Sequence, residues 1–198
     1  MKFCNQCGNP VSLRIPADDD RQRYVCDTCE HVHYQNPRII VCTLPCHQNK
    51  VLLCKRAIEP RFGLWTLPGG FLENGETTFE GALRETWEEA GAKVEIRGLY
   101  TLYNLPHIDQ VHLFFRSTLL NLDYKAGKES LEVKLFEQGE IPWDAIAFPA
   151  VGNTLEHYFK DLPGNDFPVR MADVIVNARR EREIKALGAP DHGPLPTS

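Results

Sequence analysis

The chain has 198 residues, of which 22 are basic and 27 acidic, so its formal net charge at pH 7 is -5. This charge argues against a protein whose whole surface binds nucleic acid, although a local basic site could still bind a small anion. Hydrophobic residues make up 42% of the chain and charged residues 25%, which is ordinary for a soluble globular protein with one good-sized domain and a small module.

The sequence has no evident targeting or membrane segment. It shows no apolar h-region near its start and no run of 18 apolar residues. Neither secretion nor membrane spanning is therefore supported, and we expect a cytoplasmic protein that does not bind membranes. Seven cysteines are present, and this odd number does not favour a disulfide framework.

Two cysteine pairs lie in the first 34 residues. Cys4 and Cys7 form one C-x-x-C pair, and Cys26 and Cys29 form another after an interval of 18 residues. Two such pairs offer four thiolates, which can close a tetrahedral shell around a metal. The spacing predicts a zinc ribbon over residues 1–34 that holds a structural Zn²⁺ with no open position for catalysis.

Apolar and polar residues alternate in residues 11–15 and 21–25, which predicts the short hairpin that such a ribbon needs. Two alternatives to the four-cysteine site stay open, namely a redox pair and a mixed site that uses His31 or His33. Otherwise we expect these histidines to be surface or hinge residues.

A second domain is expected over residues 35–162, because Pro37 biases Asn36 away from helix at the boundary. β-Branched residues in 38–44 and 51–54 predict strands, with a polar turn between them. The remaining cysteines lie in or beside these strands, and we expect buried thiols that act as small hydrophobic groups. They are Cys42, Cys46 and Cys54.

Residues 70–92 form a glycine-rich loop followed by an acidic helix that ends at a glycine. Thr77 and Glu80 make a capping box, so the helix is expected to begin near Thr77, and Gly91 supplies its end. A stripe at three- and four-residue spacing is suited to packing. It consists of Phe79, Ala82, Leu83, Thr86 and Ala90.

Glu85, Glu88 and Glu89 stand at i, i+3 and i+4 of this helix, so their carboxylates project from one face. Most acidic clusters are simply solvated faces. Here the preceding glycines let the backbone turn back towards the carboxylates, where a carbonyl can complete a metal shell. Oxygen ligands of this kind favour Mg²⁺ or Mn²⁺ over zinc.

The helix is followed by further strand patterns. They occur in residues 93–104, 110–121 and 131–136, with a helix expected at 151–159. Together these segments predict an α/β fold, an α/β/α sandwich around a mixed sheet. Beyond it, residues 163–198 are expected to hold a linker, a C-terminal helix over 171–187 and a disordered tail.

Basic residues occur at Arg179, Arg180 and Arg182 in that last segment. They suggest nucleic-acid binding, but Glu181 and Glu183 interrupt them, so a solvated helix with mixed charges is favoured and nucleic acid is not expected as a partner.

The loop and helix match a known signature position by position. Gly70, Glu76, Arg84-Glu85, Glu88-Glu89 and Gly91 stand at the spacing that defines the Nudix hydrolases, which this 23-residue stretch therefore resembles. Only Thr86 and Ala92 replace bulkier aliphatic residues. The resemblance implies an α/β/α sandwich and an enzyme that hydrolyses the diphosphate bridge of a small nucleotide substrate, giving a nucleoside monophosphate and a phosphorylated remainder.

The same resemblance assigns roles to residues of the stretch. Glu85, Glu88 and Glu89 would be catalytic and would hold Mg²⁺ or Mn²⁺, with the Gly70 carbonyl as a further ligand. Glu76 and Arg84 would connect the loop to the helix by a salt bridge and would contact the metal ligands without binding the metal themselves.

Other roles are less sharply defined by the sequence. The general base is either a glutamate of the helix or an acid of a distant loop, where Glu129 is our candidate and Glu132 the alternative. Arg56 and Arg61 lie near the loop and are candidates for binding substrate phosphates, a solvated turn being the alternative.

Substrate choice is suggested by features outside the signature. A zinc ribbon before such a domain resembles the NADH pyrophosphatases, but the array Ser-Gln-Pro-Trp-Pro-Phe-Pro of that group is missing. Pro106 instead follows Gly91 by 15 residues, which resembles ADP-ribose pyrophosphatases. We therefore expect ADP-ribose or FAD as substrate. Hydrolysis of NADH and a nucleotide- or RNA-binding regulatory module are the alternatives, and a homodimer is consistent with the family.

Stacking on an adenine is one reading of three aromatic residues in the expected strands, and packing in the core is the other. They are Tyr100, Tyr103 and Phe114.

Overall fold

The computed structural model describes residues 1–177 and 182–187. Contacts between Cα atoms divide the chain into two compact units, one of residues Met1–Pro37 and one that begins at Arg38. No helix in these described ranges is long and apolar enough to cross a membrane.

The first unit is a small three-stranded antiparallel sheet in which β2 lies between β1 and β3. Its strands are β1 (Val11–Arg14), β2 (Arg23–Cys26) and β3 (Val32–His33). The predicted hairpin is therefore confirmed, with Val11 opposite Cys26. His33 is buried rather than at the surface, and its ring meets that of His31 edge to face at 4.7 Å between centroids.

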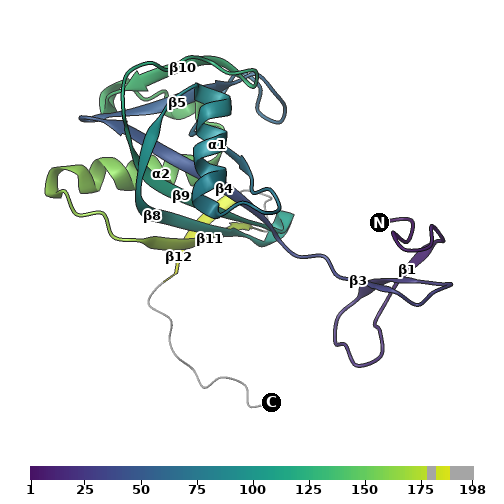
Figure 1. Cartoon of the computed structure of the whole chain (residues 1–198). Coiled ribbons are helices and arrows are strands. Elements are labelled where there is room, and N and C mark those ends of the chain that lie inside the picture. Colours follow the sequence, from purple (N-terminus) through teal and green to yellow (C-terminus); the bar gives the residue numbers. More distant parts are fainter. Residues whose placement is uncertain (178–181, 188–198) are drawn as a thin grey trace. The chain divides into compact units, whose positions relative to one another are not determined.

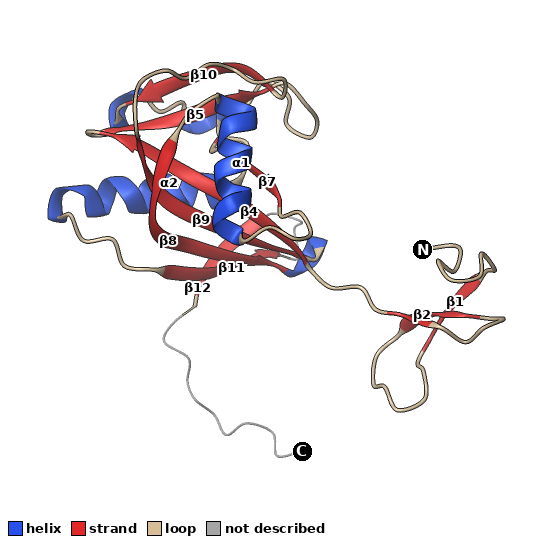
Figure 2. Cartoon of the chain, viewed as in Figure 1, coloured by secondary structure: helices blue, strands red, loops and turns tan. Residues whose placement is uncertain are grey.

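The second unit is built on one mixed sheet with the strand order β10-β5-β4-β9-β8-β11-β12 (Figure 2). Two short strands attach to it, β6 to β5 and β7 to β4. The strands are β4 (Arg38–His47), β5 (Lys50–Arg56), β6 (Trp65–Thr66), β7 (Gly69–Phe71), β8 (Val94–Leu105), β9 (Gln110–Leu119), β10 (Ser130–Phe136), β11 (Arg170–Val176) and β12 (Arg182–Ala186).

Helices α1 (Thr78–Ala90) and α2 (Pro149–Asp161) cover opposite faces of this sheet (Figure 1). Alternate residues of β4 show why, since Val41 packs with Ala82 of α1 whereas Cys42 packs in the cluster that contains Leu155 of α2. Single 3-10 turns complete the unit. They are η1 (Pro106–Ile108), η2 (Gln138–Glu140), η3 (Trp143–Ala145) and η4 (Leu162–Gly164).

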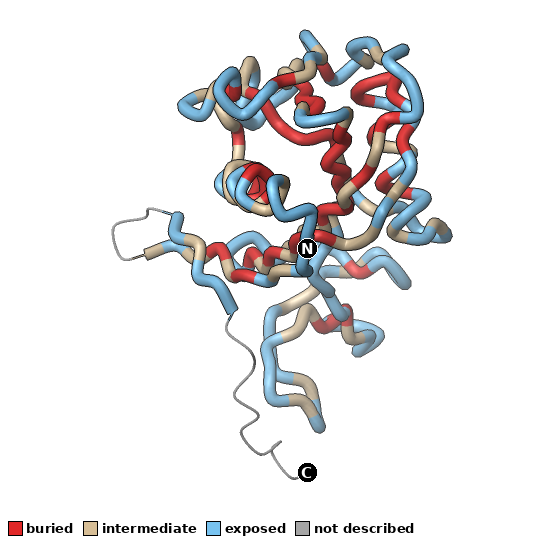
Figure 3. Tube along the Cα trace, turned by 90° about the vertical axis from the view of Figure 1, so that its left-hand side faces the viewer, coloured by how far each residue is buried: buried red, intermediate tan, exposed pale blue. Residues whose placement is uncertain are grey.

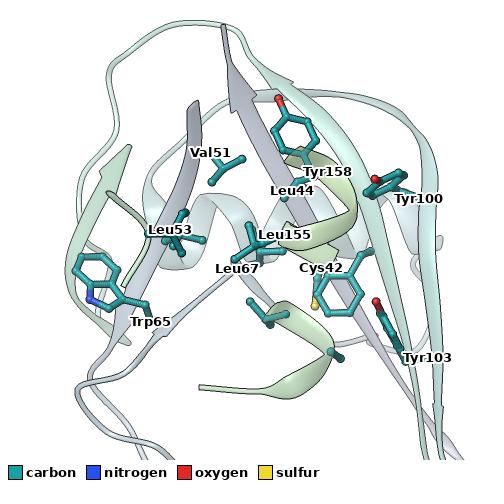
Figure 4. Close-up of a cluster of buried hydrophobic side chains, with 14 of the residues drawn as sticks. Cys42, Leu44, Val51, Leu53, Trp65, Leu67, Tyr100, Tyr103, Leu155 and Tyr158 are labelled. Carbon is teal, nitrogen blue, oxygen red and sulfur yellow. The ribbon is translucent and has the colours of Figure 1, made fainter. Parts of the chain in front are cut away.

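This arrangement is the predicted α/β/α sandwich. Buried residues concentrate along the central strands and the inner sides of the helices, with exposed residues outside them (Figure 3). The largest core cluster lies between the sheet and α2, where Leu44 and Leu53 meet Leu155 (Figure 4). The cysteines of this unit are all buried, as expected, and are Cys42, Cys46 and Cys54.

The aromatic residues considered for stacking belong to this core instead. Tyr100, Tyr103 and Phe114 are each about 1% exposed, and Figure 4 shows Tyr100 and Tyr103 within the core cluster. The hydroxyl group of Tyr103 donates to Asn153 of α2 over 2.9 Å. None of the three is free to contact a ligand, so the stacking alternative is wrong and the core alternative is confirmed.

The helix predicted over residues 171–187 is also wrong. Residues 170–176 form β11, which pairs in parallel with β8, and residues 182–186 form β12, which pairs with β11. Ala172 and Val174 are buried in the core, so burial on a sheet outweighs the helical preference of the segment. Arg179, Arg180 and the predicted tail at 188–198 lie outside the described residues.

Candidate active site

Helix α1 begins and ends where the sequence predicted. Thr77 is its N-cap, whose hydroxyl group accepts a hydrogen bond from the Glu80 amide at 3.2 Å, while the Glu80 carboxylate accepts from the Thr77 amide at 2.8 Å. Gly91 ends the helix in the left-handed conformation, with φ of 55°. The positions of the acidic side chains along the helix are thereby set by local interactions.

The three glutamates of this helix differ strongly in burial. Glu89 is 7% exposed, and its carboxylate accepts a hydrogen bond of 3.2 Å from the Gly69 amide. The side chain of Glu85 is 13% exposed and that of Glu88 is 55% exposed. Their carboxylates therefore extend from a buried position beside β7 out to solvent.

Gly70 lies directly against the Glu85 carboxylate. A Cβ atom built on Gly70 would lie 2.6 Å from the carboxyl carbon and from both carboxylate oxygens of Glu85. Only glycine brings the main chain this close to the acidic side chain, so the backbone around Gly70 and the carboxylate of Glu85 share one small volume.

Arg84 joins the helix to the loop before it. Its guanidinium donates to Glu85 at 2.7 Å and to Glu88 at 3.4 Å, and it also donates to both carboxylate oxygens of Glu76, at 2.7 and 3.0 Å. The Glu73 amide donates to Glu76 as well. The Arg84 guanidinium, followed by this amide, lowers the pKa of Glu76 to about 2, so the pair stays charged at any physiological pH.

Burial disfavours the charged forms of the inner carboxyl groups. Burial, followed by the charges of Glu85 and Glu129, raises the pKa of Glu89 to about 8, against the Gly69 hydrogen bond and the Arg56 charge. Burial also raises the pKa of Glu85. A bound divalent cation would stabilise the charged forms of these buried carboxyl groups. Mg²⁺ and Mn²⁺ suit the position because they prefer oxygen ligands.

The three carboxylates are spread more widely than the cysteine cluster of the first unit. Among the described residues, only those four cysteines form a group of three or more His, Cys, Asp or Glu whose ligand atoms all lie within 4.8 Å of one another. Mutual repulsion of the three carboxylates acts against a tighter group, whereas one nitrogen of Arg84 donates to both Glu85 and Glu88 and holds these two near each other.

The loop after β9 packs its backbone on the C-terminal end of α1. The amides of Lys125 and Gly127 donate to the carbonyls of Ala90 and Glu89 at 2.8 and 2.9 Å. A Cβ atom on Gly127 would lie 1.7 Å from the Glu88 carbonyl oxygen, so only glycine allows this approach.

That loop brings Glu129 to the acidic cluster. Glu129 is exposed, lines the same cleft as Glu85 and Glu89, and its charge raises the pKa of both. Glu132 lies on β10 opposite Lys55 and does not line the cleft.

A cleft with a volume of about 1420 Å³ is lined by the acidic cluster, the N-terminal end of α2, the turn η1 and strand β11. Arg56 lines it, with its Nε donating to the Pro60 carbonyl at 2.9 Å and its guanidinium carbon 5.2 Å from the centre of the Phe148 ring. Arg61 and Pro106 are both exposed and neither lines the cleft.

The end of the cleft away from the glutamates is formed by residues that the sequence did not single out as site residues. The 3-10 turn η1 and strand β11 meet there, where the Nδ1 atom of His107 lies 3.1 Å from the Val174 carbonyl oxygen. The sequence offered one signal for them: Gln110 and His112 are two residues apart at the start of a predicted strand, so their side chains are expected on the same face. The lining residues at this end include Ile40, Leu105, His107, Ile108, Gln110, His112, Val174 and Arg182.

In the first unit, the four cysteines lie close enough together to hold one metal ion. No disulfide joins them, and the shortest distances between their sulfur atoms are 3.4 Å for Cys7 and Cys26 and 3.5 Å for Cys7 and Cys29, with 3.8 Å for Cys4 and Cys29. Four sulfurs around a tetrahedral Zn²⁺ lie about 3.8 Å apart, because each Zn–S bond is about 2.3 Å. The thiols therefore fit this ion.

Comparison with known families agrees with both units. The family described as Nudix N-terminal, a zinc ribbon, matches residues 2–35, and the family described as NUDIX domain matches residues 36–151.

Individual relatives are also similar. An ADP-ribose pyrophosphatase of Methanocaldococcus jannaschii is 33% identical over 142 residues, which cover 70% of this chain and 80% of that protein. The NAD-capped RNA hydrolase NudC of Vibrio atlanticus is 35% identical over 96 residues, but these cover 48% of this chain and only 33% of that protein.

A solved structure resembles nearly the whole chain. The crystal structure of a NUDIX hydrolase from Nitrosomonas europaea is 53% identical, covers 87% of this chain and 99% of its own, and has a TM-score of 0.83. An ADP-ribose pyrophosphatase from Streptococcus suis, with 20% identity and a TM-score of 0.57, shares the fold.

Proposed function

The chain belongs to the Nudix hydrolases, and on this premise we propose that it hydrolyses the diphosphate bridge of ADP-ribose or FAD in the presence of Mg²⁺ or Mn²⁺. The observation that carries the proposal is the row of carboxylates from Glu85 to Glu89 beside Gly70, in a cleft whose volume of about 1420 Å³ is large enough for a dinucleotide-like substrate. In this reaction water adds to a phosphorus atom and the bridging P–O bond breaks. ADP-ribose would give AMP and ribose 5-phosphate, and FAD would give AMP and FMN.

The proposed cation ligands are Glu85, Glu88, Glu89 and the Gly70 carbonyl. A bound divalent cation would neutralise the diphosphate and make the attacking water easier to deprotonate. Arg84 and Glu76 would hold the carboxylate of Glu85 in place through their hydrogen bonds.

Glu129 is the proposed general base. It faces the cluster from a separate loop and is exposed to water, whereas the alternative, Glu132, lies outside the cleft. Arg56 is proposed to contact a phosphate, because its guanidinium is held at the cleft by Pro60 and Phe148. For Arg61 and Pro106, contact with the substrate stays a prediction from the sequence.

In the first unit the proposed metal is a structural Zn²⁺ bound by Cys4, Cys7, Cys26 and Cys29. The distances of 3.4 to 3.8 Å between their sulfur atoms fit a tetrahedral shell around one ion. All four positions of the shell are filled by the protein, so this ion would take no part in hydrolysis.

The match to NudC favours NAD derivatives as a second candidate substrate class. The test is a comparison of products and kcat/KM for ADP-ribose, FAD and NADH, each with Mg²⁺. We expect AMP from ADP-ribose or FAD at a kcat/KM at least about tenfold above that for NADH. A preference for NADH would support the second candidate, and turnover of none of the three would contradict the proposal.

A further inference from the structure

The loop of residues 120–129, between β9 and β10, is held on two sides near its end. On one side the Gly127 amide donates to the Glu89 carbonyl of α1 at 2.9 Å. On the other side the Glu129 carbonyl accepts from the Ala57 amide, directly after β5, at 2.8 Å. Within three residues the loop is therefore fixed both to the helix of the acidic cluster and to the sheet.

Position 127 requires glycine because of a contact and not because of its backbone conformation. Gly127 does not have a positive φ, in contrast to Gly91 at the end of α1. A Cβ atom at Gly127 would lie 1.7 Å from the carbonyl oxygen and 2.8 Å from the carbonyl carbon of Glu88. Both are main-chain atoms, so no rotation of a side chain relieves the overlap.

An added methyl group at position 127 would move the loop rather than the helix. Helix α1 is fixed by its caps, and Glu89 and Ala90 at its end are buried. The loop residues around Gly127 are exposed, namely Lys125, Ala126, Lys128 and Glu129. Because a methyl carbon and an oxygen must stay about 3 Å apart or more, the loop would have to move by about 1 Å.

Glu129 follows Gly127 by two residues and would move with it. Its charge acts on Glu85 and Glu89, and all three residues line the same cleft. A general base must lie within hydrogen-bond distance of the water that it deprotonates. A displacement of about 1 Å is enough to lower a rate by about 100-fold.

We propose that Gly127 is a positioning residue, which lets the loop lie directly on α1 and thereby sets the distance between the Glu129 carboxylate and the carboxylates of the helix. The inference rests on the proposed function in one respect, the role of Glu129 as general base. Gly127 acts through Glu129 and takes no part in the chemistry itself.

The test is a double-mutant cycle on kcat, with ADP-ribose and FAD as substrates in the presence of Mg²⁺. It compares the wild type, Gly127→Ala, Glu129→Gln and the double variant. We expect each single substitution to lower kcat by about 100-fold. The double variant should be no slower than the slower single variant, because moving the loop cannot impair a base that is already absent. Independent effects would instead multiply to about 10,000-fold.

Mn²⁺ binding, followed by electron paramagnetic resonance, separates positioning of the base from damage to the metal site. Gly127→Ala should keep the wild-type affinity, since the proposed ligands stay on α1. Gly164→Ala, whose Cβ atom would meet no atom within 4 Å, should keep the wild-type kcat. Wild-type kcat in either single variant, a multiplied loss in the double variant or weaker Mn²⁺ binding in Gly127→Ala would overturn the inference.

Amide hydrogen exchange, measured by NMR, tests the contact of the loop with α1 even where a variant does not fold. The amides of Lys125 and Gly127 donate to α1, so in the wild type we expect their exchange to be slowed by about tenfold or more. Rapid exchange of both in the wild type would overturn the inference.

A failure of the proposed function would look different, because the wild type would hydrolyse neither substrate. The exchange measurement still decides about Gly127 in that case. Protection of the two amides in the wild type and its loss in Gly127→Ala would support the positioning of the loop by Gly127, and equal protection in both proteins would overturn it.

Discussion

Glu89 is a buried carboxyl group whose ionisation opposes folding. Its pKa is raised from 4.5 to about 8 in the folded protein, so its contribution to stability is fully present below about pH 4.5 and is lost as the pH rises through 8. In metal-free buffer we expect the free energy of unfolding to fall over this range, and to fall less in Glu89→Gln. Urea unfolding at several pH values measures the difference.

Glu95→Gln is the matched control for that experiment, because Glu95 is exposed on β8 and pairs with Arg97 at 2.8 Å. It should keep the pH dependence of the wild type. Added Mg²⁺ should reduce the loss in the wild type, since a bound cation stabilises the charged carboxylate. Identical pH profiles for the wild type and Glu89→Gln would contradict this account of Glu89.

Gly70→Ala tests the close contact between the main chain and Glu85. The new Cβ atom would lie 2.6 Å from the carboxylate, so either Glu85 or β7 must move. Because small displacements of catalytic groups are costly, we expect kcat/KM for the preferred substrate to fall by about 100-fold with little change in the melting temperature.

Gly139→Ala is the control for that substitution, since a Cβ atom at Gly139 meets no atom within 4 Å. Steady-state kinetics of the two variants provide the comparison. Wild-type turnover in Gly70→Ala would show that the contact has no role in catalysis.

At the scale of elements, the capping box predicts a measurable stability contribution. Thr77→Ala removes the acceptor for the Glu80 amide at the start of α1 and should lower the free energy of unfolding by about 1 kcal/mol. Thr77→Ser keeps a hydroxyl group and should restore most of it. Chemical denaturation compares the three proteins, and equal loss in both variants would argue against the cap as the cause.

Helix α1 could be predicted because its ends are local. Thr77, Glu80 and Gly91 interact within a few residues of one another, and the spacing of the glutamates follows from the helix itself. The packing stripe was less accurate, because Phe79 and Leu83 are 49% and 38% exposed. Which side of a helix is buried depends on the sheet beneath it.

Strands β11 and β12 could not be predicted in the same way. The pairing of Asp173 with Asn104 of β8, which includes a side-chain hydrogen bond of 2.9 Å, joins residues 69 positions apart. The sequence near Asp173 gives no sign of this partner, and the i, i+4 pair of Glu181 and Lys185 suggested a helix instead. Long-range pairing outweighed the local preference.

Across the whole molecule, features set by closely spaced residues were predictable from the sequence, and features set by residues far apart in the chain were not. The acidic end of the cleft and the four-cysteine cluster come from closely spaced residues and were predictable from spacing. The other part requires β4, β8, β9 and β11 to assemble in register, so only the folded chain brings Gln110 and His112 of β9 to the same cleft as Val174 of β11.

The division into two compact units predicts that the ribbon can be unfolded separately. Cys26→Ser should abolish zinc binding and the hydrogen-exchange protection of β1 to β3, because a small sheet of this kind depends on its metal. Protection of β4 to β9 should stay as in the wild type. Thr28→Ala, in the same turn, should retain one zinc per chain by native mass spectrometry.

Loss of protection throughout β4 to β9 in Cys26→Ser would contradict the independence of the two units. Retention of zinc in Cys26→Ser would contradict the four-cysteine assignment.

The proposed hydrolysis depends on a divalent cation bound by the carboxylates of α1. The most direct measurement is a Mn²⁺ titration followed by electron paramagnetic resonance, together with Mg²⁺-dependent turnover, for the wild type and Glu85→Gln, Glu88→Gln and Glu89→Gln. We expect weaker Mn²⁺ binding and a kcat lower by about 100-fold or more in these variants, with Glu95→Gln unchanged. Wild-type Mn²⁺ affinity and turnover in all three variants would contradict it.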